Sequence, residues 1–221
     1  MATARTRAPA SVAGTGEVSA SFAAVLPGEP VTVRFMNTLW ADRHGVHDAI
    51  STTSDLRAWL SAIQLDDESD SNEEPAPNND DLERFRTLRD ALRRLAALVT
   101  GDTRPAAASP ITDIDQAVAA VNDAAVQAAT WPQLHYKDGA LQRVSAGSAT
   151  PARRALSSIA SHSIATFTGE DRVQLRACFA PGCVLYFVKD HPRREWCSTA
   201  CGNRVRAARH YQRHRKNQRR D

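Results

Sequence analysis

Cys178-Phe179-Ala180-Pro181-Gly182-Cys183 and Cys197-Ser198-Thr199-Ala200-Cys201 hold all four cysteines of this 221-residue chain, with thirteen residues between the two segments. Pro181-Gly182 is a turn dipeptide, so the first segment can fold back and aim both sulfurs at one ion. The i, i+4 spacing of the second pair places both sulfurs on one face of a helix. Four thiolates are the donor set of a closed, structural zinc site. We therefore predict one structural Zn²⁺, held by Cys178, Cys183, Cys197 and Cys201.

Three other uses of the four cysteines stay open at this point. Two disulfides would suit an exported protein, although no signal-peptide pattern opens the chain. A catalytic zinc site usually includes histidine, and His191 lies between the pairs, but no His-x-Glu or His-Glu-x-x-His motif accompanies it. A redox-sensing centre that releases its metal would use the same four residues. Because no cluster of acid, base and nucleophile emerges elsewhere, we expect a protein that is not an enzyme.

The segment between the cysteine pairs predicts the shape of a small zinc module. Residues 184–188 are apolar and favour a strand, residues 189–192 a turn, and residues 193–196 a returning strand. A helix then begins near Ser198. We expect a knuckle, a hairpin and a helix, with Trp196 packed over the metal. A module of about 50 residues buries too little core to fold without the metal.

Charge is distributed unevenly along the chain. The net charge is only +3, but from Arg172 onward 13 Lys and Arg face three acids, a net charge of +10, whereas the first 171 residues have 15 bases and 22 acids, a net charge of −7. Such an asymmetry is typical of a polyanion-binding end joined to an acidic body. All four cysteines lie in the basic part.

The helix predicted after Cys201 carries the basic residues as a stripe. Like charges at this spacing repel one another and destabilise an isolated helix, so phosphates are the more natural partners of the stripe than solvent alone. We predict contacts to duplex DNA; structured RNA, an acidic protein partner and mere solubility are the alternatives. The predicted nucleic-acid-binding residues are Asn203, Arg204, Arg206, Arg209, Arg213, Arg215 and Lys216.

The rest of the chain predicts a mainly α protein with a small β-hairpin component. Residues 31–35 form a short strand or lead into a helix, and residues 36–63 have helical spacing in two pieces. Further helices are expected over 82–99, 111–129 and 152–168, with Gly101 ending the first and Trp131-Pro132 the second. Asp138-Gly139 predicts a hairpin turn. On the 82–99 helix, the face opposite the apolar stripe carries Arg84, Arg86, Arg93 and Arg94.

Residues 66–83 contain nine acids and no base and are interrupted by two prolines. This composition predicts a disordered acidic loop, inserted between helices. A competing interpretation is that this acidic segment competes with nucleic acid for binding to the basic C-terminal part of the chain. The longest apolar stretches span only a few residues, whereas a membrane-spanning helix needs about 20, so we expect no membrane association.

Several of these motifs resemble a known family. Trp196-Cys197-Ser198 with Cys201-Gly202-Asn203-Arg204 resembles the CGNR zinc finger of bacterial proteins, and Asn37-Thr38 with Leu88-Arg89-Asp90-Ala91-Leu92 resembles the helical ABATE domain that precedes it. The resemblance implies stress-induced transcription regulators that bind DNA in the bacterial cytoplasm. The resemblance implies an ABATE-like helical domain (21–169) and a zinc finger with a basic C-terminal helix (170–221). Residues 1–20 precede it, and their composition without periodicity predicts a flexible tail.

Asn37 and Arg89 are polar residues within otherwise apolar motifs. Such residues commonly satisfy buried backbone groups. The functional hypothesis is that they line a pocket for a small-molecule effector, which would regulate DNA binding only by preferring one of two states of the body.

Overall fold

The computed structural model describes residues 26, 28–63, 76–129 and 131–218. This part of the chain forms six α-helices and three two-stranded antiparallel sheets, which confirms the mainly α fold with a small hairpin component. None of the described helices is long and apolar enough to cross a membrane. In chain order the elements are α2 (Val31–Met36), β1 (Leu39–Asp42), β2 (Gly45–Asp48), α3 (Thr53–Ile63), α4 (Asn79–Thr100), α5 (Ile114–Ala125), β3 (Trp131–Lys137), β4 (Ala140–Ala146), α6 (Pro151–Thr168), β5 (Leu175–Ala177), β6 (Tyr186–Val188) and α7 (Thr199–Gln218).

Helix α4 is the longest helix of the body and follows the predicted stripe of apolar residues. Its C-cap is Gly101 in the left-handed conformation (φ 63°), as expected. Its start lies earlier than the acidic composition of 66–83 suggested. The Asn78 side chain accepts from the Asp81 N–H at 2.9 Å, and the Asp81 carboxylate accepts from the Asn78 N–H at 3.1 Å. This capping box makes 79–83 helical, which corrects the end of the predicted loop, while residues 64–75 lie outside the described residues.

The prediction of a helix directly after residue 36 was wrong. Residues 39–48 form the β1–β2 hairpin instead, with Leu39 opposite Asp48 and Asp42 opposite Gly45. Gly45 has φ 129°, a conformation that favours glycine and permits the tight turn. Trp131 and Pro132 end no helix either, because α5 already stops at Ala125 and these two residues open β3.

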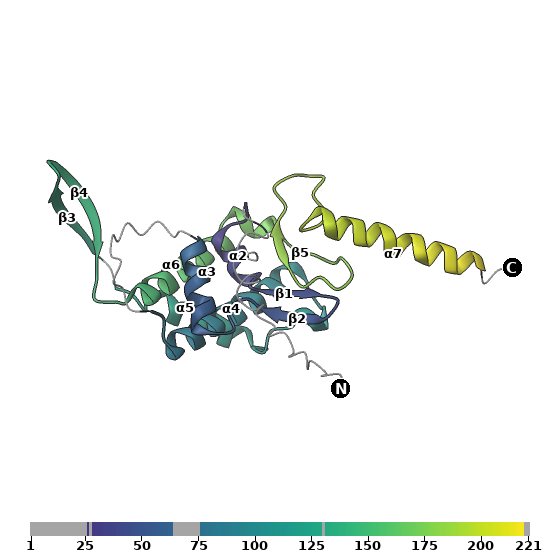
Figure 1. The fold of residues 1–221 in the computed structure, drawn as a ribbon, viewed down its shortest axis with the longest axis horizontal. Coiled ribbons are helices and arrows are strands. Elements are labelled where there is room, and N and C mark those ends of the chain that lie inside the picture. The colour runs from purple at the N-terminus through teal and green to yellow at the C-terminus, as the bar shows by residue number, and fades with distance from the viewer. Residues whose placement is uncertain (1–25, 27, 64–75, 130, 219–221) are drawn as a thin grey trace, which may run out of the picture.

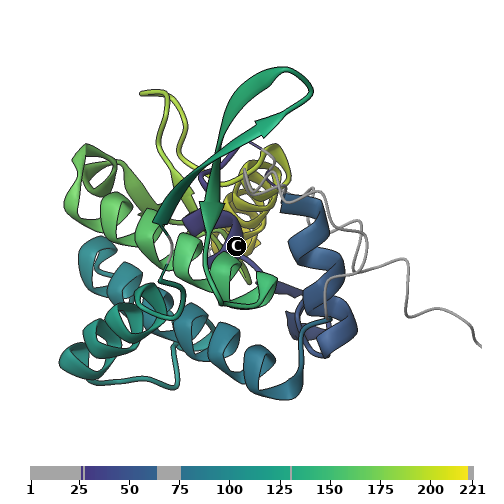
Figure 2. The ribbon, with the colours of Figure 1, turned by 90° about the vertical axis from the view of Figure 1, so that its left-hand side faces the viewer.

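Helices α4, α5 and α6 pack side by side and, with α2 and α3, enclose the main core (Figure 2). Phe35 of α2 is central, with its ring 5.2 Å from that of Trp59 and 6.0 Å from that of Phe85. Leu175 and Tyr186, from the two strands that flank the first cysteine pair, belong to the same buried cluster. The cysteine-containing segment is therefore built onto the helical body through a shared core.

Two elements project from opposite ends of the molecule (Figure 1). One is the β3–β4 hairpin, whose turn residues Asp138 (φ 53°) and Gly139 (φ 79°) both have positive φ, as predicted for an Asp-Gly turn. The other is α7, which extends away from the cysteine cluster. The basic end of the chain thus stands clear of the acidic body.

Candidate metal centre and nucleic-acid interface

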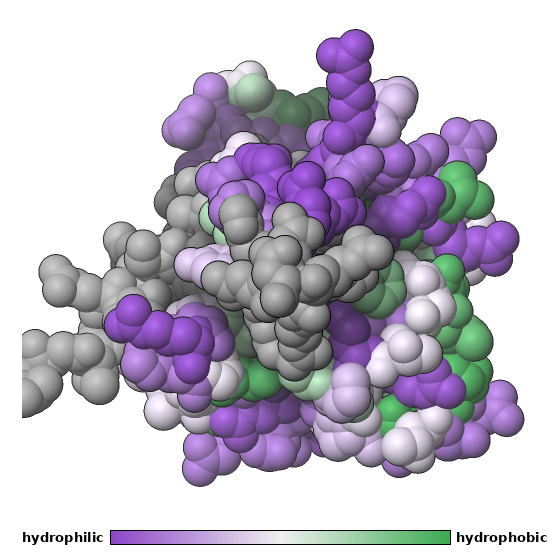
Figure 3. Space-filling model, turned by 90° about the vertical axis from the view of Figure 1, so that its right-hand side faces the viewer, coloured by the Kyte–Doolittle hydropathy of each residue, from purple (hydrophilic) through white to green (hydrophobic). Residues whose placement is uncertain are grey.

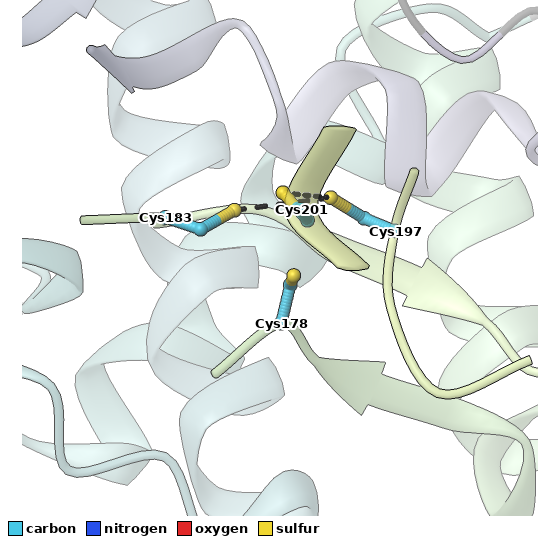
Figure 4. A group of neighbouring side chains, drawn as sticks. All are labelled: Cys178, Cys183, Cys197 and Cys201. Carbon is cyan, nitrogen blue, oxygen red and sulfur yellow. Dashed lines mark hydrogen bonds between the residues drawn. The ribbon is translucent and has the colours of Figure 1, made fainter. Parts of the chain in front are cut away.

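The four cysteine sulfurs gather at one buried point between β5, the knuckle and the first turn of α7 (Figure 4). All four Sγ atoms lie within 4.8 Å of one another, with 3.8 Å between Cys183 and Cys197 and 3.4 Å between Cys197 and Cys201. Zinc–sulfur bonds of about 2.3 Å place tetrahedral sulfurs about 3.8 Å apart. All four thiols are free, so the cluster fits one structural Zn²⁺ and confirms the predicted cofactor.

The first cysteine pair lies in the zinc knuckle, the turn formed by residues 178–183 between β5 and β6. The Cys178 N–H donates to the Leu185 carbonyl at 2.9 Å, and the Cys183 N–H donates to the Ala180 carbonyl at 2.9 Å. Gly182 (φ 72°) adopts the left-handed conformation that the reversal requires. The hairpin differs from the predicted one, since Tyr186–Val188 pairs with Leu175–Ala177 and not with residues 193–196. The strands therefore flank the first cysteine pair.

The second pair lies at the start of α7. Cys197 precedes the helix, and Cys201 lies in its first turn, where its N–H donates to Ser198 Oγ at 3.3 Å. Hydrogen bonding from the Cys178 thiol, with smaller contributions from Cys183 and Cys197, holds the pKa of Cys201 below the ordinary thiol value of 9.0. Hydrogen bonding from Cys183 likewise lowers the pKa of Cys178 to about 6, whereas hydrogen bonding from Cys178 raises the pKa values of Cys183 and Cys197. Cys178 and Cys201 are therefore the two thiols that the cluster favours in the thiolate form that zinc binds.

Trp196 packs against the cysteine cluster, as predicted from the sequence. The position of Gly202 depends on this packing, because a Cβ there would lie 3.2 Å from Cδ1 of the Trp196 ring. His191 is exposed, accepts from the Arg193 N–H through Nδ1 at 3.1 Å, and is not part of the sulfur cluster. The geometry is therefore that of four sulfur ligands.

Arg104, which the sequence analysis missed, holds the knuckle from the body. Its Nη1 donates to the carbonyl oxygens of Cys178 at 2.6 Å and Cys183 at 2.7 Å, while Nε and Nη2 pair with Asp102 at 2.7 and 2.6 Å. Burial raises the pKa of Asp102, but the hydrogen bonds from Arg104 and Tyr186 outweigh it, so the pKa lies below 3.8. This salt bridge positions two ligand-bearing residues.

Asn37 and Arg89 are both engaged inside the protein. The Asn37 amide pairs with the backbone of Tyr186, so it satisfies buried backbone groups, as polar residues in apolar motifs commonly do. Arg89 donates to both carboxylate oxygens of Asp48 at 2.6 and 2.9 Å and to Thr38 Oγ1 at 3.2 Å. The structure brings the two residues close together, since Asn37 ends α2 and Arg89 reaches the next residue, Thr38.

Arg93 was expected on the exposed face of its helix, and this expectation was wrong. Its side chain is 2 % exposed and donates to the carbonyls of Met36 at 3.0 Å, Ala107 at 3.3 Å and Val184 at 3.1 Å. Arg93 lies four residues after Arg89, so both occupy one side of α4. That spacing was the available signal in the sequence.

Helix α7 presents the predicted basic residues to solvent. Asn203, Arg204, Arg206, Arg209 and Arg213 are exposed, and Val205 is the one buried residue between 203 and 213, where the side chains of α7 are described. Arg215 and Lys216 belong to the same helix, but their side chains lie outside the described residues. Viewed from this end, hydrophilic residues gather around the helix (Figure 3). The structure thus brings the cations together on one projecting element.

Comparison with known families agrees with this architecture. The family model of ABATE, described as "putative stress-induced transcription regulator", matches residues 29–170, and that of the CGNR zinc finger matches residues 174–214. Neither is a family of enzymes. No curated protein matches the chain. With a match over most of its helical body and a four-cysteine finger following it, the chain belongs to the ABATE family and carries a C-terminal CGNR zinc finger.

Proposed function

We propose that the protein regulates transcription by binding duplex DNA through α7 in the bacterial cytoplasm. The observation that carries the proposal is the exposed series Arg206, Arg209 and Arg213 on a helix that projects beyond the body. Residues at i, i+3 and i+7 lie along one side of a helix. An α-helix fits the major groove of B-form DNA, and arginines neutralise phosphates or read guanine there.

The zinc centre supplies the rigidity that such a helix needs. Cys201 and Val205 anchor the first turns of α7 in the buried cysteine cluster, and the residues beyond Ala208 leave that cluster. When bound, zinc fixes the direction of the helix relative to the body. Arg84 and Arg86 of α4 are instead paired with acids of their own helix, Asp80 and Glu83, which supports α7 as the DNA-binding element.

The test compares duplex DNA affinity over a range of salt concentrations. Replacing Arg206, Arg209 and Arg213 with alanine should weaken binding and flatten the salt dependence, by about 0.9 in slope for each lost phosphate contact. The matched control removes three exposed cations elsewhere, through Arg57→Ala, Lys137→Ala and Arg143→Ala. If both triple variants bind alike, α7 does not contact the DNA.

The main alternative is an RNA-binding module. Single-stranded RNA is recognised largely by stacking on aromatic side chains, and α7 contains one tyrosine, Tyr211, and no phenylalanine or tryptophan. Competition among duplex DNA, structured RNA and single strands separates these partners. Repeating the competition after oxidation tests whether the thiolates act as a redox sensor. Since Asn37 and Arg89 are taken up by internal contacts, we propose no effector site there.

A further inference from the structure

A concavity of about 550 Å³ lies where the β1–β2 turn approaches the zinc knuckle at the base of α7. The turn packs on the cysteine cluster through Trp40 and Ala41, so its position relative to α7 is set by buried contacts. The concavity is lined by Ala41, Asp42, Arg43, His44, Pro181, Gly182 and Arg204. Two arginines from segments far apart in the sequence therefore line the same hollow.

Hydrogen bonds within the turn leave the end of Arg43 available. The carboxylate of Asp42 accepts from the His44 N–H at 2.7 Å and lies 2.8 Å from His47 Nε2, so this acid is occupied in ordering the turn. Arg43 Nε donates to His44 Nε2 at 2.9 Å, which orients the guanidinium. The terminal Nη groups of Arg43 have no partner among the described residues. These groups form the part of the guanidinium fork that recognises phosphate.

Arg204 approaches the concavity from the first turns of α7. Its Nη2 lies 2.8 Å from Cys201 Sγ, which ties the side chain to the zinc centre. Four thiolates around Zn²⁺ carry a net negative charge, and part of the Arg204 charge compensates it. Of the two arginines, Arg43 therefore has less of its charge neutralised by other groups of the protein.

We propose that this concavity binds a backbone phosphate of the duplex whose groove α7 enters, with Arg43 as the principal phosphate ligand and Arg204 as the second. The inference rests on the proposed function and deepens it. Phosphate contacts fix the register and orientation of a protein on a duplex without reading sequence. A single projecting helix can rotate and slide in a groove, and a second contact from a different element at its base removes that freedom. Gly182 leaves open space beside the knuckle, since a Cβ there would have no atom within 4 Å.

The experiment measures binding of the zinc-loaded full chain to a labelled duplex of roughly 20 base pairs, about two helical turns, over a series of salt concentrations. Arg43→Ala should reduce the affinity several-fold at low salt and lower the slope of log K against log salt by about 0.9, the value of one phosphate contact. Arg43→Lys keeps the charge and should retain most of the slope. Arg57→Ala, an exposed arginine of α3 outside the concavity, is the charge-matched control. Zinc content shows that each variant keeps its metal centre.

The outcomes distinguish this inference from the proposed function. If Arg43→Ala binds like Arg57→Ala while the Arg206, Arg209 and Arg213 variant is weakened, the concavity holds no phosphate and α7 still binds DNA. If neither the α7 variant nor Arg43→Ala differs from its control, the proposed function itself fails and the phosphate site with it. A loss of slope in Arg43→Ala that Arg43→Lys restores supports the site.

Discussion

The side chain of Asn37 pairs with the backbone of Tyr186 in the way that a neighbouring strand would. Its Nδ2 donates to the Tyr186 carbonyl oxygen at 2.9 Å, and its Oδ1 accepts from the Tyr186 N–H at 2.9 Å. Asn37 caps the end of α2, and Tyr186 opens the strand that follows the zinc knuckle. One asparagine thus joins the helical body to the metal module through two buried hydrogen bonds.

Asn37→Ala should therefore destabilise the protein. It leaves two buried backbone groups unpaired, which should lower the free energy of unfolding by about 2–4 kcal/mol, as measured by urea denaturation. Asn122→Ala, an exposed position on α5, is the control and should change stability by less than about 0.5 kcal/mol. Equal effects of the two substitutions would contradict a joining role for Asn37.

Metal analysis of the reduced protein should find about one zinc per chain, because the four sulfurs form a single tetrahedral set. Chelation should lower the melting temperature of the whole protein, since Leu175 and Tyr186 of the zinc module belong to the main core. Protein without zinc that melts at the same temperature would show that the module and the body are energetically independent.

Arg104→Ala should make the zinc easier to remove. The substitution frees the carbonyl groups of Cys178 and Cys183, and we expect the zinc affinity to fall roughly 10–100-fold, as is common when groups that support metal ligands are removed. Competition with a coloured chelator measures this affinity. Arg57→Ala, an exposed arginine without a contact to the knuckle, serves as the comparison and should bind zinc as the unmodified chain does.

Tyr186 should make the stability fall at high pH. Burial raises the pKa of its hydroxyl above the ordinary value of 10.0, and the hydrogen bond to Asp102 acts in the same direction. The folded state therefore favours the neutral form, and this stabilisation is complete below pH 10 and lost as the pH rises beyond it. Above pH 10, the difference in free energy of unfolding between the unmodified chain and Tyr186→Phe should shrink by up to about 1.4 kcal/mol per pH unit. Urea unfolding at a series of alkaline pH values tests this, and a constant difference would refute it.

The β3–β4 hairpin should be dispensable for folding. No described side chain of its two strands is buried, and Leu134, Tyr136 and Leu141 are largely exposed. Replacing residues 131–146 with a short Gly-Ser linker should change the free energy of unfolding by less than about 1 kcal/mol. Leu156→Ala in the core of α6 should cost about 2–5 kcal/mol in the same assay. A comparable loss from both changes would mean that the hairpin packs against the body in solution.

Local patterns predicted those parts of the fold that depend on nearby residues. The apolar stripe of α4 and its Gly101 cap, the Asp138-Gly139 turn and the four metal ligands were all legible in the sequence. Each is specified within a few turns of helix or by the spacing of a few cysteines. The packing of Trp196 on the cluster followed from its place beside Cys197.

The misjudged parts depend on partners that are distant in the sequence. Residues 39–48 have helical spacing but form a hairpin, which packs through Trp40 on the cysteine cluster. Arg93 looked like a surface residue because its acceptor at Val184 lies 91 residues away. Periodicity carries no information about such acceptors, and the arginines that support the zinc knuckle were missed for that reason.

Asn37 and its partner Tyr186 are 149 residues apart, so the order in which the chain is synthesised affects when the body can pack. The helices of the body are synthesised before any metal ligand, so Asn37 and Arg93 emerge before their partners Tyr186 and Val184 have been made. We expect the newly synthesised body to remain loosely packed until Cys201 has emerged from the ribosome and zinc has bound. Zinc can bind all four ligands only after Cys201 has been synthesised, and chains arrested earlier keep the exposed apolar surface that chaperones recognise.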